Sequence, residues 1–345
     1  MTGGAGFIGA HVVERLVGAG YRVINLDLLT YAGNLKNLAS VTGNVRHVFV
    51  QGDICDRRMV ATLLAEHRPE TVFNIAAESH VDRSIDNAEV FLRTNINGTF
   101  CLLDESLNYW SKLPAARKGQ FRFIQMSTDE VYGSIAEGAF TEDSNYAPNS
   151  PYAASKAAGD QMARAYGVTY GLPVIVVRAS NTYGPRQFPE KLIPHTVLSA
   201  LTGRPLPVYG EGKNVRDWMY VEDLVRGLEC VVERGSSGHV YHFAGGEERC
   251  NLDTVRMICA ELDRLRPNSN RYESGITFVT DRPGHDLRYA MSADKATRIF
   301  GWKPTTRFED GLGATVAWYL ANDDWCRAVL ARGYDVERIG TRAGS

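Results

Sequence analysis

Short apolar runs alternate with amphipathic stretches through the first half of this 345-residue chain, and this alternation limits the folds it can adopt. The amphipathic stretches at residues 10–20, 57–67 and 99–110 have the spacing of helices. Strands that alternate with helices form parallel sheets with right-handed crossovers. We therefore expect a doubly wound α/β fold. Its buried strands, rich in Val, Ile and Phe, are predicted at residues 21–27, 45–53, 71–77, 121–130 and 173–180.

A glycine-rich segment opens the chain. Gly3, Gly6 and Gly9 have the spacing G-x-x-G-x-x-G, and the residues that follow have a helical pattern. Glycines let the backbone approach a pyrophosphate at the positive end of a helix. Asp27 ends the next predicted strand about 20 residues later, where an acid binds a dinucleotide ribose and repels a 2′-phosphate. This arrangement predicts a Rossmann-type domain that binds NAD in preference to NADP.

Only Met1 and Thr2 precede the first glycine, although such a loop normally follows a β-strand. In this fold that strand lies in the middle of the sheet. Its loss is expected to leave unpaired backbone groups and an uncovered apolar slot, with poor stability and cofactor affinity. We therefore expect that the native chain starts several residues upstream or that its start is misassigned. A catalytically inactive protein is the alternative.

The pattern changes after about Arg178, where Gly-Pro turns become frequent and helical stretches such as residues 221–235 are separated by longer loops. We predict that residues 1–178 form the NAD-binding Rossmann domain with a truncated first strand. Residues 179–345 are predicted to form mainly a smaller C-terminal substrate-binding lobe, with some segments returning to the first domain. The lobe would cover the carboxyl ends of the strands, where open α/β sheets bind ligands.

The composition excludes several classes of protein. A formal net charge of −2 gives no electrostatic basis for binding nucleic acid or an anionic membrane. No apolar run reaches the roughly 20 residues needed to cross a bilayer, and the start lacks the pattern of a secretory signal. The six cysteines are scattered without a C-x-x-C pair, which favours reduced thiols over disulfides or a zinc site. We expect a cytoplasmic protein that binds no metal.

Two clusters of polar residues carry candidate chemistry. Tyr152 and Lys156 form Y-x-x-x-K on one face of a predicted helix, and a nearby ammonium is expected to lower the Tyr152 pKa toward that of a useful base. Thr128, Asp129 and Glu130 end a predicted strand. Two carboxyl groups in one site can take opposite roles, one protonated as acid and one ionised as base. An exposed helix pair and a solvated turn are the alternatives.

Three cations are candidates for neutralising the phosphates of a ligand. Arg216 has the geometry for a bidentate contact, and Lys191 and Arg282 carry the same charge. Each can instead form a structural ion pair, which for Arg216 would involve Asp217 or another carboxylate. The sequence leaves both interpretations open.

Three further residues also keep two interpretations. Asp53 and Ile54 follow a predicted strand, where they either border an adenine or form a plain turn. His80 follows the strand predicted at residues 71–77, where it either lines the site or caps a loop.

Together these segments resemble the extended short-chain dehydrogenase/reductase superfamily and, more narrowly, the nucleotide-sugar 4,6-dehydratases that act on dTDP-glucose. The resemblance runs through nearly the whole chain. The segments most specific for the dehydratase branch are STDEVYG, FPEKLIP and DRPGHD. The segments of lower specificity are TGGAGFIG, LTYAGNL, AAESHVDRSI, YAASKA and RDWMYVED.

The resemblance implies a hydro-lyase reaction in which NAD is recycled in each turnover. Tyr152 takes the proton of the C4 hydroxyl while hydride leaves C4 for NAD, and Thr128 hydrogen-bonds near the C4 oxygen. Glu130 then removes the C5 proton, and protonated Asp129 donates to the departing C6 hydroxyl. Hydride returns to C6 and leaves dTDP-4-keto-6-deoxyglucose, while Lys156 holds the nicotinamide ribose.

The resemblance also implies two sets of contacts. The NAD contacts are Gly3, Gly6, Phe7, Ile8, Gly9, Asp27, Leu28, Leu29, Thr30, Asp53, Ile54, Ala76, Ala77, Thr94, Tyr152, Lys156 and Thr182. The substrate contacts are Ser79, Thr128, Asn181, Glu190, Lys191, Leu192, Pro207, Tyr209, Arg216, Asn251, Arg282 and His285. Leu28 stands where the family often has Lys or Ser, and Thr182 stands where Asn is usual. Pro207 and Tyr209 would flank the base.

Other functions of the superfamily stay open. A sugar 4-epimerase or a nucleotide-sugar decarboxylase would share the glycines, Tyr152 and Lys156. An epimerase has no use for an acid–base pair that eliminates water, and a decarboxylase typically lacks the Asp at position 129. A non-catalytic NAD-binding regulatory protein is a further alternative, since fold alone does not determine function.

A homodimer is expected from the resemblance, through helices that start near Thr94 and Tyr152. Tyr109, Trp110 and Tyr166 fit either this interface or the core of the chain itself.

Overall fold

A parallel sheet forms the centre of the computed structural model, which describes residues 1–331. Its strands are β1 (Val23–Asp27), β2 (His47–Gln51), β3 (Thr71–Asn74), β4 (Arg122–Thr128), β5 (Val174–Ala179) and β9 (Val240–Phe243). The strands pair in parallel in the orders β2-β1 and β3-β4-β5-β9. All five strands expected from the sequence are present, and the doubly wound α/β fold is confirmed.

The first two residues lie between β1 and β3. Thr2 forms parallel bridges with Leu26 of β1 and Asn74 of β3. The Leu26 amide donates to the Met1 carbonyl, and the Thr2 amide donates to the Phe73 carbonyl, both at 2.9 Å. The Thr2 hydroxyl also donates to Oδ1 of Asn74 at 2.7 Å. The sequence predicts an uncovered slot at this place. Met1 and Thr2 occupy part of this slot, and Thr2 joins β1 to β3.

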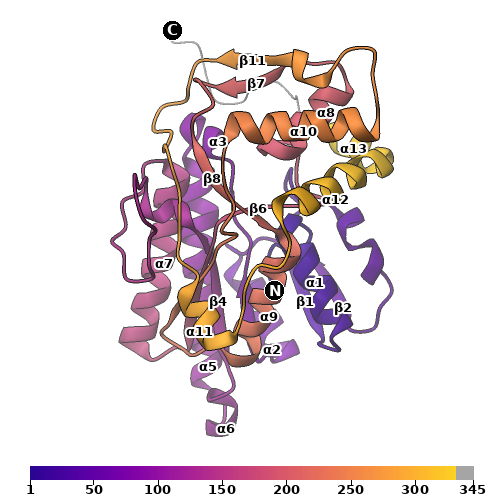
Figure 1. Cartoon of the computed structure of the whole chain (residues 1–345). Coiled ribbons are helices and arrows are strands. Elements are labelled where there is room, and N and C mark those ends of the chain that lie inside the picture. Colours follow the sequence, from indigo (N-terminus) through magenta and orange to yellow (C-terminus); the bar gives the residue numbers. More distant parts are fainter. Residues whose placement is uncertain (332–345) are drawn as a thin grey trace.

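Helices cover both faces of the sheet (Figure 1). One face packs in a shared apolar core with α1 (Phe7–Gly18), α9 (Val221–Arg234) and α11 (Asp294–Phe300). The other face packs with α2 (Arg57–His67), α5 (Thr99–Ser111) and α7 (Pro151–Tyr170). Since α9, α11 and β9 come from the second half of the sequence, segments beyond residue 179 contribute to this layer.

A second apolar core belongs to the C-terminal lobe, seen at the top of Figure 1. Its helices are α8 (Leu192–Leu201), α10 (Asn251–Leu265), α12 (Phe308–Ala321) and α13 (Asp323–Leu330). Its strand pairs are parallel β7 (Leu206–Tyr209) with β11 (Ile276–Val279), and β8 (Val215–Tyr220) with parallel β6 (Asn181–Tyr183) and antiparallel β10 (Glu248–Cys250). The predicted lobe extends to residue 345, and residues 332–345 lie outside the described part.

Short helical segments connect these layers. They are α3 (Val81–Asp86), α4 (Glu89–Phe91), α6 (Ala115–Lys118), the 3₁₀ helices η1 (Leu35–Val41), η3 (Asp129–Tyr132) and η4 (Tyr272–Gly275), and the π-helix η2 (Leu92–Gly98). No helix within residues 1–331 is both long and apolar enough to span a membrane.

Local sequence fixes where α7 begins and ends. The Ser150 side chain accepts a hydrogen bond from the Ala153 amide at 3.1 Å, and Pro151 occupies the first helical position. Gly171 ends the helix in the left-handed conformation with φ of 71°. Tyr152 is therefore held in the first turn, at the end of the helix that faces the carboxyl ends of the strands.

Tyr109, Trp110 and Tyr166 fit either an interface or the core in the sequence; in the structure Tyr166 lies in the core between α2, α5, α7 and the sheet, and the other two are half-buried against it. The Tyr109 hydroxyl donates to the Pro69 carbonyl at 3.1 Å, and the Trp110 indole donates to the Lys118 carbonyl at 3.2 Å. Tyr166 is buried. All three therefore have contacts within the chain, and a role of Tyr109 and Trp110 in an interface stays a prediction.

Candidate active site

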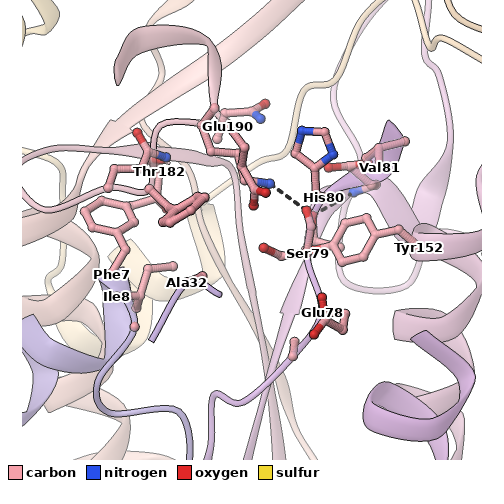
Figure 2. Close-up of a pocket in the computed structure, with 18 of the residues that line it drawn as sticks. Phe7, Ile8, Ala32, Glu78, Ser79, His80, Val81, Tyr152, Thr182 and Glu190 are labelled. Atoms are coloured by element: carbon pink, nitrogen blue, oxygen red, sulfur yellow. Dashed lines mark hydrogen bonds between the residues drawn. The ribbon is translucent and has the colours of Figure 1, made fainter. Parts of the chain in front are cut away.

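A cleft of about 470 Å³ lies where the carboxyl ends of the central strands meet the C-terminal lobe. Every residue predicted to be catalytic or to contact NAD or substrate lines this cleft, with the exception of Leu29. Figure 2 shows Phe7 and Ile8 of α1, Ser79 after β3, and Glu190 before α8 around the same space. The volume is within the usual range of small-molecule sites.

At Gly3 and Gly9 the glycine loop approaches neighbouring backbone too closely for a side chain. Gly3 has φ of 71°, and a Cβ built there would lie 2.6 Å from the Ala76 amide nitrogen. A Cβ at Gly9 would collide with the Gly3 carbonyl oxygen. The loop therefore presents bare backbone at the N-terminus of α1, an arrangement that fits the pyrophosphate of a dinucleotide.

Asp27 closes the glycine loop onto the end of β1. Its Oδ2 accepts from the Ala5 amide and its Oδ1 from the Leu29 amide, both at 2.8 Å. Burial raises the pKa of Asp27, although these two bonds act against the shift. Leu29 does not line the cleft, because its backbone adopts the left-handed conformation with φ of 56° and its side chain packs against the core beneath α1. The predicted contact of Leu29 with NAD stays a prediction.

Asp53 and Ile54 form a turn that also lines the cleft, so the turn interpretation is confirmed and the adenine contact stays a prediction. Asp53 accepts from the Cys55 amide at 2.8 Å, which is a turn contact, and pairs with Arg93 at 2.7 Å. Ile54 is buried, and both residues line the cleft. Thr182 lines it as well, and its hydroxyl donates to the Ser180 carbonyl at 3.1 Å.

Lys156 is buried one helical turn after Tyr152. Its Nζ donates to the Met126 carbonyl of β4 at 2.7 Å, and burial lowers its pKa to about 8. The pKa of Tyr152 lies well above its ordinary value because of burial and then the charges of Glu130 and Asp129. The prediction that Lys156 lowers this pKa is therefore wrong for the protein alone, because burial and the carboxylates outweigh the ammonium.

Asp129 and Glu130 follow β4 in the short helix η3. Thr128 starts this turn: its hydroxyl donates to Asp129 Oδ1 at 3.0 Å and accepts from the Glu130 amide at 3.3 Å. Burial, and then the Glu130 carboxylate, raise the pKa of Asp129 to about 8. The Oδ2 atom of Asp129 is buried and has no hydrogen-bond partner within the described chain.

Glu130 has a different electrostatic environment. Burial raises its pKa, but Arg282, Lys191 and Arg216 act in the opposite direction. For Asp129, Arg216 also acts to lower the pKa, but its effect is smaller than those of burial and Glu130. Burial therefore raises the pKa of both carboxyl groups, but three cations oppose this rise at Glu130 and only one does so at Asp129.

The three candidate cations all reach the cleft. Arg216 does not pair with Asp217; it donates to the Asp286 carbonyl at 3.0 Å, and its guanidinium lies 4.3 Å from the centre of the Tyr289 ring. Lys191 donates to the Ser79 carbonyl at 2.5 Å. Because the partners of Arg216 and Lys191 in these hydrogen bonds are uncharged main-chain carbonyls, the bonds do not neutralise either positive charge. The third cation, Arg282, pairs with Asp82 at 2.8 Å.

Glu190 and His80 belong to a polar group beside the substrate end of the cleft. Tyr31 donates to Glu190 at 3.1 Å, and burial raises the pKa of Glu190 to about 7. His80 caps α3 by accepting from the Arg83 amide at 3.2 Å, and it also lines the cleft. Burial, and then Lys191, lower its pKa to about 3, so the ring is neutral.

Sequence reasoning missed several cleft residues, namely Glu78, Asp82, Gln187 and Tyr289. Glu78 and Asp82 lie within the segment AAESHVDRSI, whose resemblance to the superfamily could have indicated that they belong to the site. Among the described residues, no group of three His, Cys, Asp or Glu side chains could hold a metal ion.

Comparison with known proteins agrees with this geometry. Residues 1–315 match the family model described as GDP-mannose 4,6 dehydratase. The chain is 53% identical to a dTDP-glucose 4,6-dehydratase of Xanthomonas campestris pv. campestris over 343 residues, which cover 99% of this chain and 98% of that protein. It is 51% identical to one of Neisseria meningitidis serogroup B, with the same coverage of 99% and 98%.

A solved structure is also similar. The crystal structure of the dTDP-glucose 4,6-dehydratase DesIV from Streptomyces venezuelae, which has NAD bound, matches with a TM-score of 0.87 and 46% identity. The match covers 95% of this chain and 98% of that chain. From its sequence, fold and cleft, the chain belongs to the dTDP-glucose 4,6-dehydratase family.

Proposed function

We propose that this chain converts dTDP-glucose to dTDP-4-keto-6-deoxyglucose by NAD-dependent loss of water. The observation that carries the proposal is the contrast between Asp129 and Glu130. With a pKa of about 8, Asp129 is protonated near neutral pH, whereas three cations favour the ionised form of Glu130. Elimination of water requires an acid and a base in one site, and a 4-epimerase has no use for that pair.

The proposed reaction starts at the C4 hydroxyl of the sugar. Tyr152 takes the hydroxyl proton, and the Thr128 side chain is proposed to lie near the C4 oxygen. Lys156 lies one helical turn from Tyr152, where its charge acts against the rise in the Tyr152 pKa that burial and the two carboxylates cause. Bound NAD supplies a positively charged hydride acceptor for C4 and returns the hydride to C6.

The carboxyl groups then remove water. The ketone at C4 acidifies the C5 hydrogen, and Glu130 takes this proton. Asp129 donates its proton to the C6 hydroxyl, which leaves as water. Because Thr128 occupies Oδ1 of Asp129, the buried and unpartnered Oδ2 is available to the C6 oxygen. After C6 receives the hydride, Glu130 returns a proton to C5.

Four features of the chain would hold NAD. The bare backbone at Gly3 and Gly6 fits the pyrophosphate, and Asp27 fits an adenosine ribose without a 2′-phosphate. Ile54 offers an apolar wall beside the adenine, and Lys156 is proposed to hold the nicotinamide ribose.

The substrate is proposed to lie against the C-terminal lobe, which we regard as the substrate-binding domain. Arg216 and Lys191 would meet the diphosphate, since carbonyl oxygens leave their charge available. Pro207 and Tyr209 of β7 would flank the base.

We also propose a homodimer formed through α5 and α7, which pack against each other. Phe100 of α5 and Val168 and Tyr170 of α7 expose apolar surface, with Val168 75% exposed. Light scattering should give a dimer mass for the wild type, and Phe100→Asp with Val168→Asp should give a monomer. A monomeric wild type would contradict this proposal.

A cytoplasmic location is proposed as well, since all six cysteines are free thiols, as is usual in a reducing compartment. Fractionation of the cells that produce the protein would test it.

The central test is incubation of the purified protein with dTDP-glucose and NAD in deuterated water. The expected product is dTDP-4-keto-6-deoxyglucose with deuterium at C5, detected by NMR and mass spectrometry. UDP-glucose in a parallel reaction tests the choice of base, and Tyr152→Phe serves as the inactive control. A product inverted at C4 with no loss of water would indicate an epimerase instead.

A further inference from the structure

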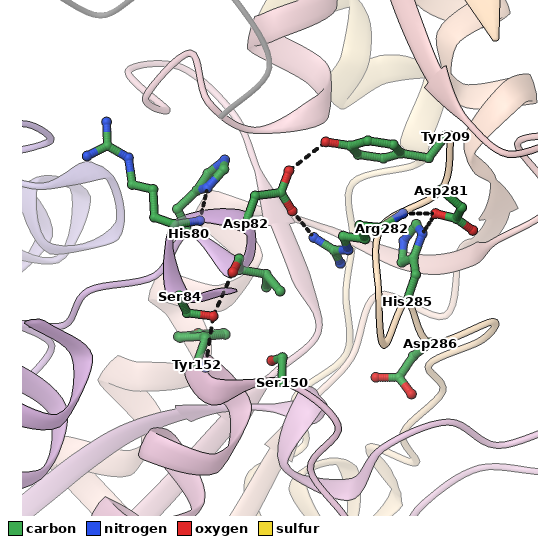
Figure 3. A network of polar contacts seen from close by, with 12 residues as sticks. His80, Asp82, Ser84, Ser150, Tyr152, Tyr209, Asp281, Arg282, His285 and Asp286 are labelled. Carbon is green, nitrogen blue, oxygen red and sulfur yellow. Dashed lines mark hydrogen bonds and ion pairs between the residues drawn. The ribbon is translucent and has the colours of Figure 1, made fainter. Parts of the chain in front are cut away.

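Helix α3 contributes Val81 and Asp82 to the lining of the cleft, and Asp82 contacts two residues of the C-terminal lobe (Figure 3). Oδ1 of Asp82 accepts from an Arg282 guanidinium nitrogen at 2.8 Å. Oδ2 accepts from the Tyr209 hydroxyl at 2.5 Å. These partners lie 200 and 127 residues away in the sequence. A single carboxylate therefore ties the sheet layer to two separate segments of the lobe.

The contacts of Asp82 with Arg282 and Tyr209 are buried, and each carboxylate oxygen of Asp82 accepts a hydrogen bond. The Asp82 side chain is 7% exposed and that of Arg282 is 15% exposed. Burial acts to raise the pKa of Asp82, yet Arg282 and the hydrogen bond from Tyr209 bring it below its ordinary value. Asp82 is thus ionised at neutral pH, and both of its oxygens are used.

Arg282 retains hydrogen-bonding capacity toward the cleft residues. Its Nε is buried and has no partner within the described chain, although the guanidinium is fixed by Asp82. An arginine fixed by a carboxylate loses less side-chain entropy when it binds an anion. The Tyr209 ring is likewise fixed by its hydroxyl, edge-on to His285 with ring centres 5.8 Å apart.

The other side of α3 reaches the start of the catalytic helix. The Ser84 hydroxyl accepts from the Tyr152 amide at 3.1 Å and donates to the Val81 carbonyl at 2.6 Å. The same short helix therefore contacts both the lobe and the first turn of α7.

We propose that Asp82 is a positioning residue that presets Arg282 and Tyr209 for the nucleotide diphosphate of the substrate. This inference rests on the proposed function, in which Tyr209 flanks the base of that substrate, and on the family resemblance, which implies that Arg282 contacts the substrate as well. Asp82 takes no part in the reaction. Its removal frees the Arg282 guanidinium and the Tyr209 ring, and this weakens substrate binding.

The test measures dTDP affinity by calorimetry, together with KM and kcat for dTDP-glucose. In Asp82→Ala the Kd for dTDP and the KM should rise by roughly 10- to 100-fold, which corresponds to a charge-assisted hydrogen bond, while kcat changes much less. Asp82→Asn keeps an acceptor and should recover part of the loss. Tyr209→Phe, which keeps the ring, should give a smaller rise.

A double-substitution cycle shows whether Asp82 acts through Arg282. If it does, Asp82→Ala adds clearly less to the Kd in an Arg282→Ala background than in the wild type. Asp223→Asn is the matched control, because Asp223 is a buried carboxylate outside the cleft that pairs with Arg226. This control is expected to lower the melting temperature without changing dTDP affinity.

Unchanged or tighter dTDP binding by Asp82→Ala would overturn the proposal; tighter binding would mean that Asp82 competes with the phosphates for Arg282. Full additivity with Arg282→Ala would overturn it too. If wild-type protein binds no dTDP and leaves dTDP-glucose unchanged, the proposed function fails, and this inference fails with it. If the wild type turns over dTDP-glucose normally and the Asp82 variants bind dTDP as the wild type does, only this inference is wrong and the proposed function stands.

Discussion

Asp160 and Arg178 form a fully buried ion pair, with 3.1 Å between Oδ2 and Nε. Asp160 lies on α7, the helix that carries Tyr152 and Lys156, and Arg178 lies on β5. Ser127, at the end of β4, donates its hydroxyl to the same Asp160 oxygen at 2.8 Å. Asp160 also lies one helical turn after Lys156 and acts to raise the pKa of that lysine. The strand and helix that carry the site are therefore joined by one carboxylate.

Asp160→Ala should lower the free energy of unfolding by about 3–5 kcal/mol, because it leaves the Arg178 charge buried without its partner. Urea denaturation measures this loss. Asp324→Ala is the control, since Asp324 pairs with Arg327 on the surface and is 91% exposed. Equal effects of the two substitutions would contradict the structural role of the buried pair.

Asp129→Asn should lower the rate of dehydration by about 10²–10⁴-fold, as expected for loss of a general acid. The asparagine cannot protonate the C6 hydroxyl, but Tyr152 still accepts the C4 proton. Hydride transfer should therefore continue, and absorbance of reduced nicotinamide should appear without the 4-keto-6-deoxy product. Normal dehydration by this variant would refute the role given to Asp129.

Lys156 should make stability depend on pH. Its pKa is lowered from 10.5 to about 8, so between these values the unfolded chain binds a proton that the folded chain has lost. The contribution of Lys156 to the free energy of unfolding therefore rises with pH across this window and is least favourable below about pH 8.

Lys156→Met removes the cost of burying the ammonium. We expect it to abolish activity and to raise the free energy of unfolding near pH 7 by about 2–3 kcal/mol, a gain that fades toward about pH 10. Denaturation curves at the two pH values measure this. Lys213→Met, at an exposed lysine, should show no such difference between pH values. A stability gain of Lys156→Met that is independent of pH would contradict the explanation.

The sequence predicts most of the site because its chemistry lies at strand and helix ends. An apolar run locates β4, and Pro151 marks the start of the helix that carries Tyr152 and Lys156. These two elements bring Thr128 and Asp129 to the same edge of the sheet as Tyr152 and Lys156. Asp82 was missed because its partners are 127 and 200 residues away, and no local pattern encodes such contacts.

Local patterns also fail where backbone geometry or desolvation decides. Leu29 follows the ribose acid in sequence, yet its left-handed backbone turns it from the cleft. The pKa of Tyr152 depends on burial and on two carboxylates, which the Y-x-x-x-K spacing does not contain. Thr2 pairs with two strands at once, although a two-residue segment carries no strand signal.

Gly9 and Gly18 of α1 differ in the space around them. A Cβ at Gly9 would collide with the Gly3 carbonyl oxygen, so Gly9→Ala must displace the loop proposed to hold the pyrophosphate. We expect it to weaken NAD binding by at least about tenfold, because misplaced backbone amides lose the helix-terminal contact.

Gly18→Ala is the matched control, because a Cβ there meets no atom within 4 Å. It should leave NAD binding unchanged and stabilise the protein by about 0.5 kcal/mol through helix propensity. Fluorescence titration with NAD and thermal unfolding of both variants measure the two effects. Equal NAD affinity in Gly9→Ala and wild type would show that the close approach of the loop is not needed for the cofactor, and the assignment of the glycine segment would fall.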